Sequence, residues 1–308
     1  GPINADTTFV IVNATSDSAP SCEYTPIAGS TGSSVTIEVG VPDATISAAA
    51  APDVCSGSGT SIAVQGTPNG VVTYTINGAN PTTITLDNGG NATIQTGNLT
   101  ASTTFALTNI ELEDCSNTIE NQSSTVNVIE LPVASFTAAQ TEICEGTTTT
   151  LNFTGTPGAV VTYTDGTTTY TTPALDGLGN APVTTPALTN PAISYTYTLV
   201  SVSVNTPILC TSPLTDSLVI EVLENPAIAT QPLGGSICPT TSHTFTVAAT
   251  GDNLQDQWMF AGNPIGTNQN SYTVTNATSA NAGDYYVVVS SNCGTAVTSA
   301  MATLTISE

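Results

Sequence analysis

An internal duplication of short, alternating β segments constrains the fold of this chain more than any other feature. Residues 66–75 recur as residues 155–164, 89 positions later, with eight identities in ten. The same offset relates Cys55 to Cys144. Matches of this kind at one fixed offset indicate a duplicated domain.

Within each repeat, apolar side chains alternate with threonine and other polar residues. Val72, Tyr74 and Ile76 form one such run. A period of two, many β-branched residues and frequent Asn-Gly or Asp-Gly turns predict short antiparallel strands. No segment has useful helical periodicity. The expected fold class is therefore all-β, with tandem immunoglobulin-like antiparallel β-sandwiches in a rod and an incomplete N-terminal sandwich.

The predicted domains meet at short junctions that contain proline. We expect boundaries that give residues 1–41, 42–131, 132–224 and 225–308. Because proline fixes φ and the junctions are too short to be flexible linkers, the joints should be stiff.

Residues 1–41 hold only the last two strands of a sandwich, since Cys22 and residues 35–39 match the end of the next repeat. Two strands with an apolar face are not stable alone in water. We therefore predict a donor hairpin whose first strand completes a sandwich in a neighbouring copy. The donor residues are Thr8, Phe9, Val10, Ile11 and Val12. The alternative is a sandwich truncated from a longer protein.

The last domain has a different pattern. Trp258 follows a strand that contains Val247, and Tyr285 precedes Val287. This order predicts a core tryptophan and a tyrosine corner, with the two valines in the place of the inter-sheet cysteines of antibody domains.

The chain contains no lysine or arginine, 23 aspartate or glutamate residues and a single histidine, so its formal net charge is −23. Such a chain has no basic surface for nucleic acid or an anionic membrane, so we expect neither nucleic-acid binding nor membrane insertion. No stretch approaches the ~20 apolar residues of a membrane span. We expect an exported, mature chain without a signal peptide, located outside the cell or on its surface.

Seven cysteines fall into two positional classes and indicate an oxidising compartment. Pairing within each repeat is favoured because the two classes recur together; it gives Cys55–Cys115, Cys144–Cys210 and Cys238–Cys293 and leaves Cys22 unpaired or intermolecular. Sandwich geometry favours a second pairing, across successive repeats, because the two positions normally lie at opposite ends of one domain. That alternative gives Cys55–Cys210 and Cys144–Cys293, and frees Cys238 and Cys22 to join successive molecules.

Motifs for catalysis are missing. His243 stands at the start of a predicted strand, where a solvated histidine is expected, and no nucleophile, phosphate-loop or metalloprotease motif accompanies it. We expect no enzyme activity, no cofactor and no metal site.

Three short Asp-Ser/Thr segments match an O-glycosylation motif of Bacteroidota. The candidate modified residues are Thr7, Ser18 and Ser217.

The repeated elements, Cys-x-Gly, Gly-Thr-Pro-x-x-Val-Val-Thr-Tyr-Thr and Leu-Asp-x-x-Gly-Asn-Ala, resemble the tandem PKD-like and immunoglobulin-like repeats of Bacteroidota surface proteins. These include gliding-type adhesins and fibres exported by type IX secretion. The resemblance implies that residues 42–131 and 132–224 are Ig/PKD-like and that residues 225–308 form a bacterial Ig-like domain.

The resemblance also implies a structural subunit of an extracellular, pilus-like filament whose partners are other copies of the chain. The alternative is a stalk or ligand-binding segment of a large adhesin. In that case surface glycans would be partners, and Trp258 and Phe260 would be candidate platforms, although core packing explains both aromatic residues better.

Overall fold

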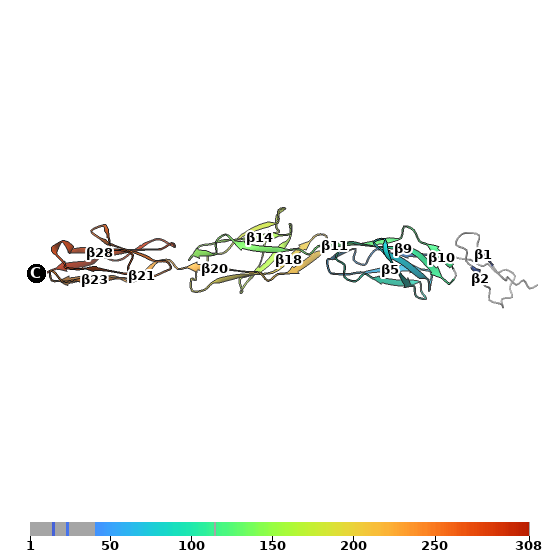
Figure 1. Ribbon diagram of the computed structural model, residues 1–308, viewed down its shortest axis with the longest axis horizontal. Helices are drawn as coiled ribbons and strands as arrows, with labels where there is room; N and C mark the ends of the chain where they lie inside the picture. Colours follow the sequence, from blue (N-terminus) through green and yellow to red (C-terminus); the bar gives the residue numbers. More distant parts are fainter. Residues whose placement is uncertain (1–13, 16–22, 25–40, 114, 308) are drawn as a thin grey trace, which may run out of the picture. The chain divides into compact units, whose positions relative to one another are not determined.

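Structure is described for residues 14–15, 23–24, 41–113 and 115–307, in a computed structural model of the chain. These residues form three β-sandwiches, and their one helical element is the 3₁₀ turn η1 (Ser279–Asn281) (Figure 1). The predicted all-β, tandem immunoglobulin-like fold class is confirmed. The boundaries at residues 42, 132 and 225 stay predictions.

The first sandwich contains two sheets, ordered β4-β11-β9-β6-β7 and β3-β5-β8, with β10 paired to β9. Its strands are β3 (Ala44–Ile46), β4 (Asp53–Cys55), β5 (Ser61–Gly66), β6 (Val71–Ile76), β7 (Ala79–Thr85), β8 (Asn91–Gln95), β9 (Thr103–Leu112), β10 (Cys115–Thr118) and β11 (Ser123–Ile129).

The middle sandwich repeats this topology, with sheets ordered β13-β20-β18-β15-β16 and β12-β14-β17, and with β19 paired to β18. Its strands are β12 (Ala134–Ala138), β13 (Glu142–Cys144), β14 (Thr150–Gly155), β15 (Val160–Thr164), β16 (Thr169–Thr171), β17 (Asn180–Thr184), β18 (Tyr195–Asn205), β19 (Leu209–Pro213) and β20 (Ser217–Leu223).

The last sandwich has one sheet ordered β22-β30-β28-β25-β26, with β29 on β28, and two strand pairs, β21-β24 and β23-β27. Its strands are β21 (Ala227–Thr230), β22 (Gly235–Ile237), β23 (His243–Thr246), β24 (Ala248–Thr250), β25 (Gln255–Phe260), β26 (Asn263–Ile265), β27 (Ser271–Val274), β28 (Gly283–Ser290), β29 (Val297–Thr298) and β30 (Ala302–Ile306).

One strand pair in each sandwich is parallel, whereas the sequence predicted antiparallel pairing throughout. The chain leaves the smaller sheet after β3, β12 or β21 and crosses to the other sheet, where β4, β13 and β22 run parallel to β11, β20 and β30. The second and the final strand of each sandwich thus lie side by side. A cysteine ends β4 and β13 and directly follows β22, and it therefore lies beside the end of the final strand in each sandwich.

The duplicated motifs are explained by close backbone packing. Gly90 has φ of +74°, and a Cβ atom added there would lie 2.1 Å from the carbonyl oxygen of Gly66. The carboxylate of Asp87 accepts hydrogen bonds from the backbone N–H groups of Asn91 and Gly89, which lower its pKa. The same arrangement surrounds Asp176 in the second copy. The repeated residues therefore serve the fold and need no ligand to explain them.

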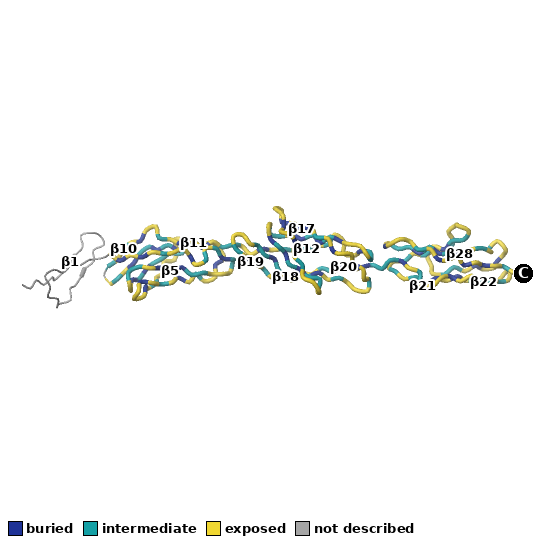
Figure 2. The backbone as a smooth tube through the Cα atoms, turned by 180° about the vertical axis from the view of Figure 1, so that it is seen from behind, coloured by how far each residue is buried: buried dark blue, intermediate teal, exposed yellow. Residues whose placement is uncertain are grey.

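Three hydrophobic cores lie between the sheets, one in each sandwich (Figure 2). Phe105 and Phe153 are buried in the first two, and each such side chain contributes about 2–3 kcal/mol relative to exposure. In the last sandwich Trp258 is fully buried and its ring N–H donates to the carbonyl of Gln269. The predicted core tryptophan is confirmed.

The predicted tyrosine corner is also confirmed. The hydroxyl of Tyr285 donates to the carbonyl of Asn281 at 2.9 Å. Val247 and Val287 are buried in the same core, as the sequence predicted for the positions of the missing cysteines.

The chain divides into two compact units. One comprises Gly1–Leu131 together with Asn205–Cys210, and the other comprises Pro132–Val204 and Thr211–Glu308. Near the amino terminus, β1 (Ala14–Thr15) pairs antiparallel with β2 (Glu23–Tyr24). The predicted donor strand, residues 8–12, lies outside the described residues.

Candidate functional site

Among the described residues, no group of three or more His, Cys, Asp or Glu side chains is placed to hold a metal ion. The expectation that His243 is solvated is wrong. The ring is half-buried and packs edge-on against Phe245, with centroids 4.6 Å apart, and Nε2 lies 3.2 Å from the carbonyl oxygen of Leu233. The reason is that residues 243 and 245 share the inward face of β23.

Two disulfides between successive repeats are the main candidate for function. The first joins Cys55, at the end of β4, to Cys210 in β19, with Cα atoms 5.6 Å apart. Cys210 is fully buried, and the sulfur of Cys55 lies 3.5 Å from the carbonyl oxygen of Leu209. Because Asn205–Cys210 belongs to the first compact unit, the bond lies within that unit.

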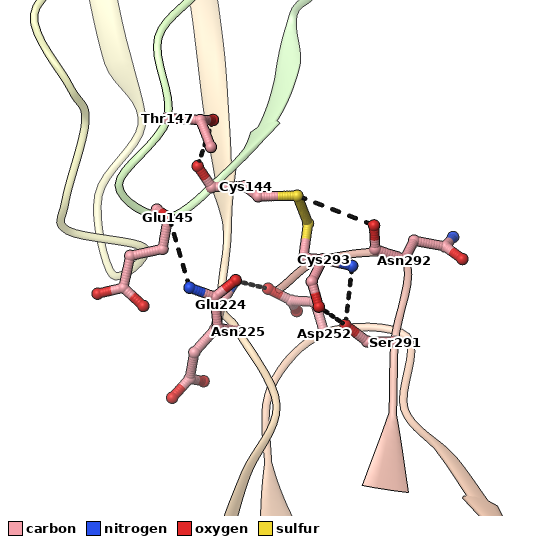
Figure 3. Close-up of a disulfide and its surroundings, with 9 residues drawn as sticks. All are labelled: Cys144, Glu145, Thr147, Glu224, Asn225, Asp252, Ser291, Asn292 and Cys293. Carbon is pink, nitrogen blue, oxygen red and sulfur yellow. Dashed lines mark hydrogen bonds between the residues drawn. A yellow bond between two sulfur atoms is a disulfide. The ribbon is translucent and has the colours of Figure 1, made fainter. Parts of the chain in front are cut away.

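The second disulfide joins Cys144, at the end of β13, to Cys293, which follows β28 (Figure 3). The Cα atoms are 5.2 Å apart and Cys293 is buried. The sulfur of Cys144 lies 3.9 Å from the carbonyl oxygen of Asn292. In both bonds the sulfur of the first cysteine therefore lies near the carbonyl that precedes the second one. Because a disulfide sulfur has no proton, these are close contacts and not hydrogen bonds.

The favoured pairing within each repeat is wrong, and the alternative pairing across successive repeats is confirmed. In the first sandwich, Asn117 of β10 donates to the carbonyl of Pro42, so Cys115, which begins β10, lies near the start of the sandwich. Cys55 lies at the other end, where the N–H of Ser56 donates to the last strand. This separation is the sandwich geometry that favoured the pairing across successive repeats.

Three further cysteines, at positions 22, 115 and 238, lie outside these two disulfides. Cys238 is free and exposed, so its predicted bond to Cys293 is wrong; Cys293 is already bonded to Cys144. Cys115 is also disulfide-bonded. Cys22 lies outside the described residues.

Polar contacts surround the Cys144–Cys293 bond, as Figure 3 shows. The backbone N–H of Glu224 donates to the carboxylate of Asp252 at 2.7 Å. The side-chain amide of Asn225 donates to the carbonyl of Glu145 at 3.4 Å, while its Oδ1 atom is buried without a hydrogen-bond partner. A Cβ atom added at Gly294, where φ is +64°, would lie 2.7 Å from that oxygen. The middle and last sandwiches thus meet through the disulfide and through the side-chain amide of Asn225. Sequence reasoning offered the disulfide as an alternative and missed the contact of Asn225.

Because the chain has no lysine or arginine, several aspartates are hydrogen-bonded by neutral donors instead. The backbone N–H of Thr168, followed by the hydroxyl and N–H of Thr167, holds the pKa of Asp165 well below its usual range. Asp256 is the exception. Burial raises its pKa, and its Oδ1 atom has no hydrogen-bond partner.

The remaining predicted site residues are the candidates for glycosylation and the two aromatic residues of the last sandwich. Ser217 is exposed at the start of β20, and Thr7 and Ser18 lie outside the described residues. Trp258 is buried and Phe260 packs against the same core, so the structure uses both aromatic residues for packing. Across the described residues, no helix has the length and apolar character to span a membrane.

Comparison with known proteins supports the fold. No family model matches the sequence, and no curated protein matches it. Among solved structures, the chain is similar to an I-band fragment from titin, with a TM-score of 0.54 and 17% identity over 87% of this chain and 99% of that one. A three-Ig structure of titin domains with Glu-to-Ala substitutions gives a TM-score of 0.54 and 16% identity over 88% and 100%. At this identity the likeness shows tandem immunoglobulin-like domains and nothing about origin or ligand.

Proposed function

We propose that this chain is a load-bearing structural segment of an extracellular fibre or stalk. The observation that carries the proposal is the pair of disulfides between successive repeats. Each disulfide bonds two cysteines that lie on either side of a proline-bearing junction in the sequence. Consecutive sandwiches are therefore joined by the backbone and by a disulfide. Disulfides of this kind form and persist in oxidising compartments outside the cytosol.

The cysteine pattern suits a mechanical role better than a purely stabilising one. A bond within one sandwich would protect that sandwich alone. Bonds from Cys55 to Cys210 and from Cys144 to Cys293 close loops of 155 and 149 residues, and the two loops overlap in the middle sandwich. Force applied along the chain therefore passes through a disulfide at each end of the shared segment, residues 144–210.

The absence of lysine and arginine supports an exposed location. Trypsin-like proteases need a basic residue at the cleaved bond, so they cannot cut this chain even where a loop unfolds. The neutral hydroxyl and amide surface with negative charge also keeps the fibre soluble without basic groups.

Immunogold labelling of intact cells tests the proposed location. Antibodies against the last sandwich should label surface fibres without permeabilisation. Label that is seen only after permeabilisation would contradict the proposal.

The assembly route expected from the sequence is a finer proposal. Strand donation by residues 8–12 would join copies of the chain into a pilus-like filament. Deletion of residues 1–13 should then leave monomers with intact sandwiches. Fibres formed by the shortened chain would exclude donation and leave the load-bearing proposal in place.

A further inference from the structure

Cys238 occupies the position in the last sandwich that Cys55 and Cys144 occupy in the preceding two. The parallel strand pairs show the equivalence. The residue before each cysteine is paired with the final strand, as Val54↔Val128, Ile143↔Val222 and Ile237↔Ile306. The sequence predicts that Cys238 belongs to the same positional class as Cys55 and Cys144, and the strand register confirms it.

The turn that presents the cysteine is the same in the three sandwiches. In the middle sandwich, the N–H of Gly146 donates to the carbonyl of Leu188 at 2.8 Å, and the N–H of Thr147 donates to that of Cys144 at 3.0 Å. In the last sandwich, the N–H of Thr240 donates to the carbonyl of Ala277 at 2.8 Å, and the N–H of Thr241 donates to that of Cys238 at 3.3 Å. The first sandwich has the equivalent bonds around Cys55.

The last sandwich keeps this turn without the glycine that favours it. Gly57 and Gly146 have φ of +83° and +79°, and Thr240 has φ of +67° in their place. A β-branched residue is rarely found in this left-handed region. The position of the Cys238 thiol is thus preserved although the local sequence has changed.

The two equivalents of Cys238 are both bonded, which is independent evidence for the kind of partner. Each is joined to a cysteine that follows the strand of the next sandwich that pairs antiparallel with its final strand: Cys210 after β18 and Cys293 after β28. Cys55 and Cys144 are half-buried against their partners, whereas Cys238 is exposed. A thiol on a following sandwich is the group that these two bonds point to.

We propose that Cys238 forms a third disulfide of this series, with a cysteine of a further immunoglobulin-like sandwich at the position that Cys210 and Cys293 hold in theirs. The proposal rests on the proposed function and deepens it, because it extends the covalent series to a further sandwich. The partner must carry a free thiol at that position. Cys115 of a second copy holds the equivalent position but is disulfide-bonded, so the partner is a sandwich whose cysteine is still reduced.

The bond requires an oxidant. Two thiols lose two protons and two electrons as the S–S bond forms, and a disulfide such as oxidised glutathione takes them up and becomes two thiols. The first thiolate forms a mixed disulfide with one glutathione and releases the other, and the second thiolate then attacks that mixed disulfide and releases the remaining glutathione as a thiol.

A chain with one extra sandwich tests the proposal. Residues 225–308 are appended after Glu308, so that the appended Asn225 follows a glutamate as it follows Glu224 in the chain. In the appended copy Cys238 is replaced by serine, and Thr295→Ser marks its peptides. After oxidation with glutathione, unfolded samples are treated with maleimide and mapped without reduction.

The expected result is a cross-linked peptide pair from Cys238 and the appended Cys293, with loss of the maleimide adduct on both. The matched control carries Cys238→Ser and Thr241→Cys, which moves the thiol three residues along the turn. It should keep a maleimide adduct on the introduced cysteine and on the appended Cys293. Maleimide or glutathione on Cys238 in the parent fusion would overturn the proposal.

A second measurement covers the case in which the appended copy does not fold. Protein taken from its natural surface, with thiols blocked at collection, should show Cys238 bonded to a cysteine of an immunoglobulin-like sequence. A blocked Cys238, or Cys238 bonded to another Cys238, would overturn the proposal. Either failure leaves Cys55–Cys210 and Cys144–Cys293 in place, so it is distinguishable from failure of the proposed function.

Discussion

Single-molecule stretching should show that most of the chain is hidden from force while the disulfides are intact. With handles at residues 42 and 308, the reduced chain can extend over about 266 residues. In the oxidised chain, tension enters at residue 42, crosses from Cys55 to Cys210, follows the chain back to Cys144 and leaves through Cys293. Three chain segments connect the two bonds, and the one from Cys144 to Cys210 is the shortest at about 66 residues.

The magnitude follows from these segments. The oxidised path contains about 13 residues before Cys55, about 66 between Cys144 and Cys210 and about 15 after Cys293, which makes about 94 residues. About 172 residues are therefore hidden. At ~3.3–3.6 Å per extended residue, reduction should release ~570–620 Å of additional contour length.

The assay is atomic-force or optical-tweezer stretching of a variant in which Cys22, Cys115 and Cys238 are replaced by serine, with and without reductant. Only the two described bonds can then differ between the two conditions. Pairing within the repeats would leave Cys144–Cys210 as the single bond in this variant and would hide about 66 residues, or ~220–240 Å. A gain on reduction near that smaller value, or no gain, would refute the reasoning.

Three further predictions use the fluorescence of Trp258, the single tryptophan, to follow unfolding of the last sandwich in urea. Thr240→Gly should stabilise this sandwich by up to about 1 kcal/mol, because glycine adopts positive φ without strain; a lower midpoint would contradict this. Tyr285→Phe should lose about 1 kcal/mol with the hydrogen bond to the carbonyl of Asn281, and an unchanged midpoint would show that the corner contributes nothing. Burial raises the pKa of Asp256 above its unfolded value, so its contribution to stability should rise as the pH falls through the folded pKa and reach its full size below the unfolded one. Asp256→Asn should remove that gain between pH 7 and 4, and an identical pH profile for the variant would exclude Asp256 as its source.

The sequence was sufficient for the fold class because alternation and turn chemistry are local properties. Val72 and Tyr74 share one face of β6, and Gly90 must be glycine because its Cβ would meet a carbonyl. Trp258 and Tyr285 were likewise found from their order and spacing.

The disulfide pairing could not be read in the same way. It depends on which end of a sandwich meets the next, and spacing along the chain does not encode that placement. The regular recurrence of the two cysteine classes favours pairing within a repeat, whereas sandwich geometry places Cys55 and Cys115 at opposite ends. The buried amide of Asn225 was missed for a similar reason, since its partner Glu145 is 80 positions away.

The parallel strands were missed because a short strand such as β22 has too few residues to show a pattern. His243 was misjudged because a polar residue at the start of a strand was assumed to face water, although its partner at position 245 shows which face is buried.

The measurement that tests the central claim most directly is disulfide mapping of the mature protein without reduction. Trypsin cannot cut this chain, so a glutamyl endopeptidase and chymotrypsin are used. The expected cross-linked peptides hold Cys55 with Cys210, and Cys144 with Cys293. Peptides that join Cys55 to Cys115, or Cys144 to Cys210, would show that each sandwich is closed on itself and would contradict the account.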